Sequence, residues 1–218
     1  MHRRMKKFLR RESGWVTAFA ICFCSFLFML YAVMIGNFFD AFDRRSVINL
    51  AALRTPSINA FLIDLSSLGA PAVTGTLTLI TLILLALKKK TSDFYFLLIV
   101  EMGVLIGSPL LKHWVGRVRP LVELRLIDVT GLSFPSGHAY GASTYYLSVT
   151  FIAWNYYQDR ISRLCILTCA CMIIFSVCYT RVYLGVHYPS DVVAGVFFGA
   201  SWVLLIKLLF RASAFENV

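Results

Sequence analysis

A small set of cationic, imidazole, hydroxyl and carboxylate side chains stands at the ends of apolar segments. Cations neutralise a phosphoryl group, and arginine adds a planar fork that binds two of its oxygens. Of two histidines at one anion site, one must be neutral to attack phosphorus, and the other must be protonated to give the leaving oxygen a proton. The set therefore predicts a site that binds, attacks and releases a phosphate. Its members are Lys112, Arg119, Ser136, Gly137, His138, Arg181, His187 and Asp191.

The neighbours of the two histidines assign them different roles. Asp191 lies four residues after His187 and is expected to accept its Nδ1–H, which leaves Nε2 free as the nucleophile. His138 has no carboxylate beside it in the sequence and is the better general acid. No carboxylate cluster suited to magnesium accompanies them, so we expect a metal-independent reaction without a cofactor.

Prolines place two parts of this set at the starts of helices. Pro189 is expected in the first turn of the last helix, since proline is tolerated there but not deeper. Gly137 and His138 likewise open an earlier helix. Because a helix N-terminus presents free backbone N–H groups to anions, both starts favour phosphate binding, and Ser136 adds a hydroxyl.

The elements that must position these residues are membrane helices. The chain has 218 residues, of which 59% are hydrophobic and 15% charged, and its mean hydropathy is +0.75. Soluble domains are nearer a quarter charged. We therefore predict an all-α, polytopic bundle of about six transmembrane helices in one membrane-embedded domain over residues 1–218. The expected spans, each near the ~20 residues that a crossing needs, are 15–36, 68–87, 94–111, 138–157, 162–180 and 189–210.

Two segments outside the later spans need separate interpretation. The basic start of the chain resembles the n-region of a signal peptide, but the apolar run after it is too long and lacks a cleavage pattern, so we expect an uncleaved first span. In the connection 37–67, Thr55 and Pro56 predict an N-cap and the first position of a helix. Apolar residues at helical spacing follow them. They favour an amphipathic helix in the outer interface that frames a lateral entry for lipid, although a plain connector fits equally well.

The distribution of charge predicts which face of the membrane carries the site. With the N-terminus in the cytoplasm, most of the 21 lysines and arginines fall inside, as the positive-inside rule requires. The set forms three clusters along the chain: Lys112 with Arg119, then residues 135–138, then Arg181 with His187 and Asp191. The first two clusters share one loop, and the third follows two crossings later, so all three are expected on the outer face. The net charge of +10 does not indicate nucleic acid, because the cations lie between apolar runs. We expect a bacterial cytoplasmic membrane protein with its site facing the periplasm or exterior.

Three motifs in order resemble the tripartite signature of the type 2 phosphatidic acid phosphatase superfamily. They are a lysine seven residues before Arg-Pro over 112–120, Pro-Ser-Gly-His at 135–138, and Thr-Arg with a histidine and an aspartate over 180–191. Thr180 stands where the family usually has serine, and it keeps the hydroxyl. The resemblance implies a six-helix membrane phosphatase similar to bacterial phosphatidylglycerophosphatase B and undecaprenyl diphosphate phosphatases.

The same resemblance implies residue roles within the signature region 112–191. It makes His187 the residue that forms a phosphohistidine and His138 the acid. The residues that it implies hold the phosphate are Lys112, Arg119, Ser136, Gly137 and Arg181.

The expected function is metal-independent hydrolysis of a phosphate monoester or diphosphate group from a membrane lipid at the outer face. Undecaprenyl diphosphate, phosphatidylglycerophosphate and phosphatidic acid all fit such a site, and no obligate protein partner is inferred. A lipid phosphotransferase would use the same residues with an acceptor in place of water. An anion or lipid transporter would need polar residues along a path through the membrane, where the spans hold little beyond Glu101 and scattered serines and threonines.

Other residues outside the set have plainer interpretations. Glu101 is costly in a span unless it faces the bundle interior, and a structural hydrogen bond is favoured over a role with protons or substrate. Arg117 is interpreted as a solvated loop charge in preference to a headgroup contact. Gly195 and Gly199 form a small-xxx-small pair that predicts close packing within the bundle.

Overall fold

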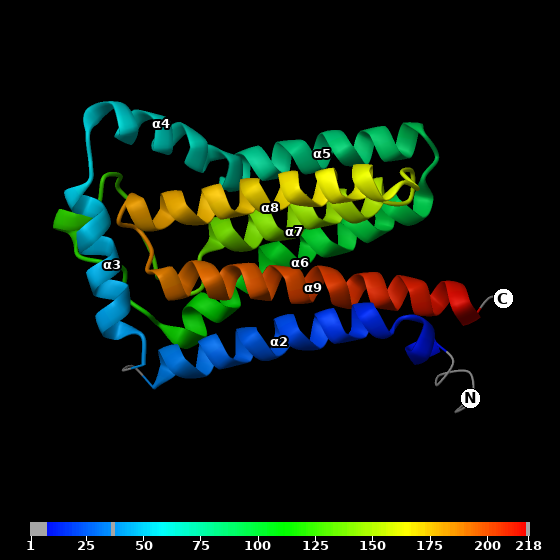
Figure 1. The fold of residues 1–218 in the computed structure, drawn as a ribbon, viewed down its shortest axis with the longest axis horizontal. Helices are drawn as coiled ribbons and strands as arrows, with labels where there is room; N and C mark the ends of the chain where they lie inside the picture. The colour runs from blue at the N-terminus through cyan, green and yellow to red at the C-terminus, as the bar shows by residue number, and fades with distance from the viewer. Residues whose placement is uncertain (1–7, 36–37, 217–218) are drawn as a thin grey trace.

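The protein is a bundle of long helices with one helix lying across its end (Figure 1). The computed structural model describes residues 8–35 and 38–216, and this part of the chain contains helices and no strand. The all-α prediction is therefore confirmed. The elements are α2 (Ser13–Met34), α3 (Asp40–Ala52), α4 (Pro56–Ser66), η1 (Ser67–Gly69), α5 (Pro71–Leu87), α6 (Thr91–Val115), η2 (Val122–Leu124), α7 (Gly137–Ala153), α8 (Arg160–Tyr183) and α9 (Pro189–Glu216).

Among the described residues, four helices are long and apolar enough to cross a membrane, namely α2, α6, α8 and α9. The bent pair of α4–η1 and α5 makes a fifth if it counts as one span. The predicted spans fall on α2, α5, α6, α7, α8 and α9. However, α5 and α7 have 17 residues each, fewer than the ~20 of a straight crossing, so six crossings stay a prediction. The basic residues before Phe8, and residues 36 and 37 at the end of the first span, lie outside the described residues.

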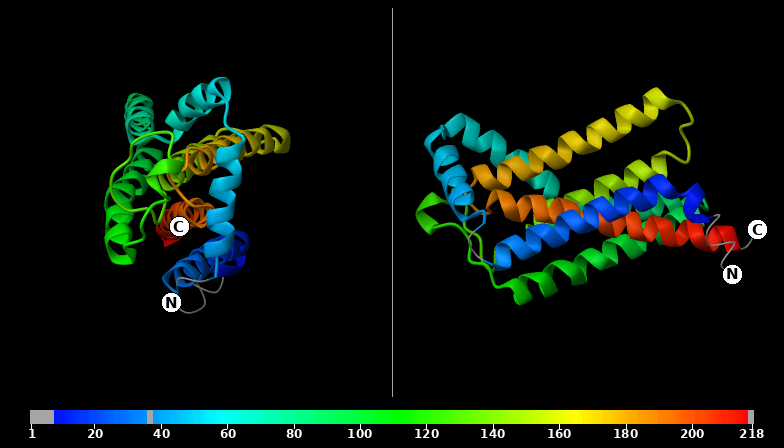
Figure 2. Two further views of the ribbon diagram at one scale, coloured as in Figure 1. Left: turned by 90° about the vertical axis from the view of Figure 1, so that its left-hand side faces the viewer. Right: turned by 60° about the horizontal axis from the view of Figure 1, so that its bottom comes forward.

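The connection after the first span contains two helices, of which the sequence indicated one. Thr55 caps α4 as predicted, accepting a hydrogen bond from the backbone N–H of Ile58 at 3.4 Å, and Pro56 occupies the first turn. Leu62 of this helix is buried while Phe61 is 64% exposed. The interfacial position of α4 stays a prediction. The unpredicted helix α3 runs across the end of the bundle (Figures 1 and 2).

Helix α7 is the centre of the bundle, and glycines let α9 approach it closely. A Cβ added at Gly195 would lie 2.8 Å from the carbonyl oxygen of Ser136, and one added at Gly199 would lie 2.8 Å from Cβ of Ser143. No side chain larger than hydrogen fits at either position without a shift. The predicted close packing of this pair within the bundle is therefore confirmed.

The ends of the central helices bring together the three clusters of predicted site residues. Helix α6 ends, α7 begins, α8 ends and α9 begins at the end of the bundle that α3 covers (Figure 1). The loop 116–136 closes over this end. The prediction that the three clusters meet at one end is thereby confirmed, whereas the side of the membrane that this end faces stays a prediction.

Candidate active site

His187 lies in the turn between α8 and α9 and is held by its Nδ1 edge. Its side chain is 2% exposed, and Nδ1 lies 3.5 Å from Oδ2 of Asp191. The hydroxyl of Ser133 donates to the same carboxylate oxygen at 2.5 Å and lies 3.3 Å from Nδ1. These contacts suit the tautomer with the proton on Nδ1, which leaves Nε2 as an acceptor.

The local sequence explains why the chain turns sharply here. Gly185 adopts φ +72°, a conformation that disfavours residues with a Cβ, and an added Cβ would meet the carbonyl oxygen of Leu124 at 1.9 Å. Pro189 then starts α9, which places Asp191 in its first turn. There the Asp191 carboxylate accepts the backbone N–H of Tyr188 at 2.9 Å and thereby closes the turn around His187.

Arg119 approaches the free nitrogen of this histidine. Its Nη1 lies 3.1 Å from Nε2 of His187 and donates to the carbonyl oxygen of Val186 at 2.8 Å. Burial lowers the pKa of His187 to about 4 despite the opposing effect of Asp191. The imidazole is therefore neutral near pH 7, and a cation stands beside its unprotonated nitrogen, where an anion would bind.

Two further cations belong to the same group of side chains. Lys112 donates from Nζ to the carbonyl oxygens of Leu132 at 2.7 Å and Ser133 at 3.4 Å. Arg181 is 3% exposed and donates from Nη1 to the Ser66 hydroxyl at 2.8 Å. Its Nε is buried and has no hydrogen-bond partner among the described residues. A buried guanidinium donor without an acceptor indicates a site built for an anion.

The start of α7 supplies the remaining predicted residues. Ser136 is its N-cap, with the hydroxyl 3.5 Å from the backbone nitrogen of Ala139. A Cβ added at Gly137 would find no atom closer than the Ser108 hydroxyl at 3.6 Å, so there is room above the backbone. The imidazole of His138 lies close enough to four groups to interact with them electrostatically, namely Arg181, His187, Arg119 and Lys112. The structure thus brings the whole predicted set to one place, while the catalytic roles stay predictions.

The interpretation of Arg117 as a solvated loop charge is wrong. Its side chain is 14% exposed and links two fully buried carboxylates, with Nη1 2.6 Å from Oδ1 of Asp191 and Nη2 2.6 Å from Oδ2 of Asp43. The Ser190 hydroxyl accepts from the same guanidinium at 2.6 Å and donates to Asp43. Burial alone would lower the pKa of Arg117, but the two carboxylates raise it above its usual value. We call Asp43, Arg117, Ser190 and Asp191 the anchoring network.

Arg117, Asp43 and Ser133 stand in sequence contexts that do not distinguish them as site residues. Arg117 stands two residues before Arg119, so both can point toward one site only if the loop between them is extended. Asp43 belongs to α3, which starts without a side-chain cap and was not recognised as a helix. Ser133 lies three residues before Ser136 in an uncharacterised loop. None of the three is marked by local pattern alone.

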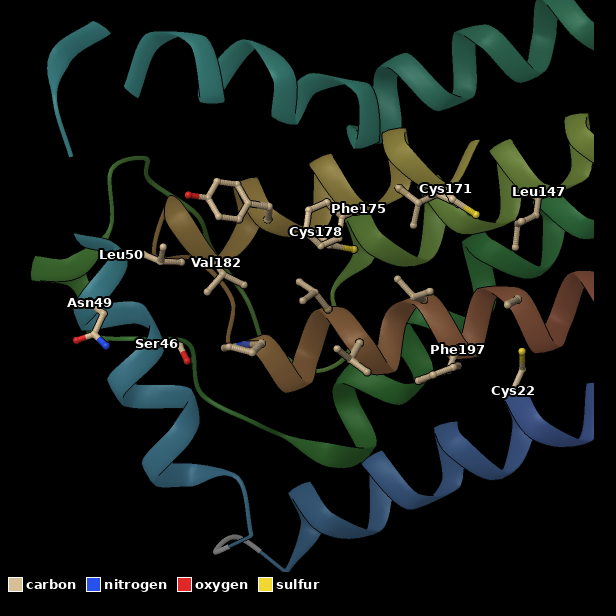
Figure 3. Close-up of a pocket in the computed structure, with 17 residues that line it drawn as sticks. Cys22, Ser46, Asn49, Leu50, Leu147, Cys171, Phe175, Cys178, Val182 and Phe197 are labelled. Atoms are coloured by element: carbon tan, nitrogen blue, oxygen red, sulfur yellow. The ribbon is translucent and has the colours of Figure 1, made fainter. Parts of the chain in front are cut away.

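A large apolar groove lies on another face of the bundle, between α3, α8 and α9 (Figure 3). Its volume is about 840 Å³, and Ser46 and Asn49 are the polar residues at its α3 end. None of the eight predicted site residues lines it. The phosphate site and this groove are therefore separate features.

Fold and site together define a class: a helical membrane protein with a buried histidine–aspartate pair beside an arginine at one end of the bundle. The chain belongs to the PAP2 superfamily, whose family model matches residues 91–214. This match contains all eight predicted site residues, from Lys112 to Asp191.

Individual relatives agree with this assignment. Phosphatidylglycerophosphatase B of Bacillus subtilis (strain 168) is 27% identical over 184 residues, which cover 84% of this chain and 90% of the relative. An undecaprenyl-diphosphatase of Sulfolobus acidocaldarius is 28% identical over 161 residues, or 70% of each chain. The crystal structure of a transmembrane PAP2-type phosphatidylglycerolphosphate phosphatase from Bacillus subtilis is similar with a TM-score of 0.81 and 26% identity, covering 89% of this chain and 96% of that one. The chain is accordingly an integral membrane protein of a lipid phosphatase family, as the sequence predicted.

Proposed function

We propose that the chain hydrolyses the terminal phosphate of a membrane lipid through a phosphohistidine on His187. The observation that carries this proposal is the buried, neutral imidazole of His187, held at Nδ1 by Asp191 and presenting Nε2 to Arg119 at 3.1 Å. A neutral nitrogen beside a guanidinium suits attack on a bound phosphate, because the cation binds the phosphoryl oxygens and the nitrogen is unprotonated.

The first chemical step transfers the phosphoryl group to the protein. Lys112, Arg119 and Arg181 bind the equatorial oxygens, and Nε2 of His187 attacks phosphorus in line. A P–N bond forms as the P–O bond to the lipid breaks, and protonated His138 gives its proton to the leaving oxygen. Stabilisation of charge on the equatorial oxygens is usually the largest contribution in such reactions.

The second step returns the enzyme to its starting state. Neutral His138 takes a proton from water, the oxygen attacks the phosphohistidine, and the P–N bond breaks to release inorganic phosphate. The proton that His138 gave to the lipid is thereby replaced. Throughout both steps Asp191 and Ser133 keep the His187 ring in place, and the chemistry requires only residues of this chain.

The substrate in this proposal is a lipid with a terminal phosphate monoester or diphosphate. Relatives named for phosphatidylglycerophosphate and for undecaprenyl diphosphate support both substrate types. The distribution of basic residues supports a site on the periplasmic or outer face of a bacterial cytoplasmic membrane.

The test is phosphate release by the purified protein in proteoliposomes with chelator present, over a panel of lipid phosphates. We expect release by the wild type, loss in His187→Ala, and an acid-labile phosphorylated protein when a radiolabelled substrate is quenched in alkali. His113→Ala is the matched control, because His113 is exposed near the end of α6 and lies outside the site. Release that persists in His187→Ala would eliminate His187 as the nucleophile. Transfer of label to an added lipid in preference to water would make the protein a phosphotransferase.

The side of the membrane is tested separately by thiol labelling in a cysteine-free background. Val118→Cys lies in the loop at the site end, and Lys88→Cys lies in the turn between α5 and α6 at the opposite end. An impermeant maleimide added to spheroplasts is expected to label Val118→Cys at once and Lys88→Cys only after permeabilisation. The reverse order would place the site on the cytoplasmic face.

A further inference from the structure

Helix α4 lies against the end of α8 that carries Arg181 (Figure 1). It continues through η1 into α5 as a pair of helices bent by 45°. The Tyr183 hydroxyl of α8 donates to Oδ1 of Asn59 on α4 at 2.8 Å. Leu62 of α4 belongs to the same buried cluster as Tyr183 and Leu184. These contacts fix the end of α4 beside the predicted phosphate site.

Ser66 is the last residue of α4, and its side chain contacts Arg181. The Ser66 hydroxyl oxygen accepts a hydrogen bond from Nη1 of Arg181 at 2.8 Å. Ser66 is 4% exposed and Arg181 is 3% exposed, so the contact is shielded from water. Ser66 also precedes residue 91, where the family match begins. No signature motif therefore includes it.

The contact with Ser66 uses one corner of the guanidinium and leaves another edge without partners. Nε of Arg181 is buried and unpartnered among the described residues, and none of these residues accepts a hydrogen bond from Nη2. Nε and Nη2 form one edge of the guanidinium plane, which can bind two oxygens of a phosphoryl group. Arg181 interacts electrostatically with Lys112, His138 and His187, so this edge belongs to the same group of side chains.

We propose that Ser66 is a positioning residue for Arg181, and that it fixes the rotation of the guanidinium so that the Nε–Nη2 edge is presented to the phosphate. The inference rests on the proposed function and deepens it by adding a residue of α4 to the site. Holding a flexible side chain in its binding geometry before the ligand arrives lowers the entropy lost on binding. Without the Ser66 hydroxyl, Nη1 loses its acceptor, the guanidinium is free to turn, and phosphate binds more weakly.

The test measures the affinity for inorganic phosphate, which requires no turnover. Phosphate is added to the purified protein in detergent at constant ionic strength, and the rise in Tm gives Kd. In Ser66→Ala, Kd is expected to rise about tenfold, the size of one hydrogen bond to a charged group. Ser66→Thr keeps the hydroxyl and is expected to restore the wild-type Kd. If Ser66→Ala fails to fold, Ser66→Cys replaces it, because sulfur is a weaker acceptor on a side chain of similar shape.

The neighbouring serine provides the matched control. Ser67 is exposed, and its hydroxyl donates to the carbonyl oxygen of Asp64 at 2.6 Å, so it makes no contact with Arg181. Ser67→Ala is therefore expected to leave Kd at the wild-type value. An unchanged Kd in Ser66→Ala, or an equal rise in Ser66→Ala and Ser67→Ala, would overturn the proposal.

A double-mutant cycle tests whether the effect passes through Arg181. The ammonium of Arg181→Lys is a point charge without an edge to orient, so adding Ser66→Ala to this variant is expected to change Kd less than about twofold. A tenfold rise in both backgrounds would assign Ser66 to general structure and overturn the positioning role.

The result is separable from the proposed function. If the wild type binds phosphate but releases none from any lipid phosphate, hydrolysis fails, and the Kd values of the Ser66 and Ser67 variants still decide the role of Ser66. If the wild type does not bind phosphate, the positioning role is overturned, whatever the activity on lipids.

Discussion

Asp43→Asn tests the anchoring network, because it removes one charge and keeps the size of the side chain. In the structure Asp43 is fully buried and accepts from Arg117 at 2.6 Å, from the Ser190 backbone N–H at 3.1 Å and from the Ser190 hydroxyl. The asparagine oxygen can keep the two contacts of Oδ2, but the amide nitrogen cannot accept the third, and the contact with Arg117 is no longer one between opposite charges. A hydrogen bond to a charged group contributes about 1.5–3 kcal/mol, so we expect unfolding to become easier by about 2–3 kcal/mol. For a chain of this length that is a fall in Tm of about 4–12 °C.

The same substitution is expected to lower kcat. With Asp43 neutral, Arg117 balances only Asp191 and attracts its carboxylate more strongly, away from Nδ1 of His187. A misplaced orienting carboxylate raises the barrier, and we expect a loss of about tenfold, which is ~1.4 kcal/mol. Thermal unfolding in detergent and phosphate release from a lipid phosphate measure the two effects in one preparation.

Asp40→Asn is the matched control on the same helix. The Asp40 carboxylate lies 3.9 Å from Arg117 and is 45% exposed, so its loss is expected to cost less than about 1 kcal/mol. If Asp43→Asn and Asp40→Asn give the same Tm and the same kcat, the anchoring network does not hold Asp191. A double-mutant cycle with Arg117→Gln then measures how much of the effect passes through the guanidinium.

Three further expectations follow from the site. Because burial lowers the pKa of His187 to about 4 and only the neutral ring attacks, its contribution to the kcat/KM profile is lost as pH falls through about 4 and not through 6.5. Gly185→Ala is expected to lower Tm far more than Gly131→Ala: both glycines have positive φ, but only the Cβ at Gly185 meets backbone, at 1.9 Å. Ser133→Ala is expected to lower kcat about tenfold with KM near the wild-type value, since its hydroxyl orients the His187–Asp191 pair; a change in KM alone would contradict this.

The parts of the site that the sequence predicted are those with local signals. Pro189 and the Ser136–Gly137 pair mark helix starts by rules that act within one turn. His187 and Asp191 are four residues apart across the start of a helix that Pro189 marks, so their contact requires no knowledge of the rest of the fold. Their convergence with Lys112 followed from counting membrane crossings between them.

The parts that the sequence missed depend on long-range partners. Arg117 and Asp43 are 74 residues apart, and nothing near either residue indicates that a buried partner exists. A loop arginine is solvated by default, and only the folded chain shows that α3 brings a carboxylate to it. Hydropathy also overextended the fourth span, since the predicted 138–157 includes aromatic residues after Ala153, where α7 ends. A hydropathy average depends on residue type alone, so it cannot distinguish aromatic residues in a connecting turn from those in a helix.

The reach of α3 into the site affects how this protein can be recombined with its relatives. The family match begins at residue 91, whereas the buried acid that balances Arg117 lies upstream at Asp43. A chimera that takes residues 91–214 from this chain would inherit Arg117 and Asp191 without the second carboxylate that pairs with the arginine. Such exchanges should succeed only with donors of the N-terminal segment that place an acid where Asp43 lies. The unit that can be transplanted is therefore larger than the unit that the signature motifs define.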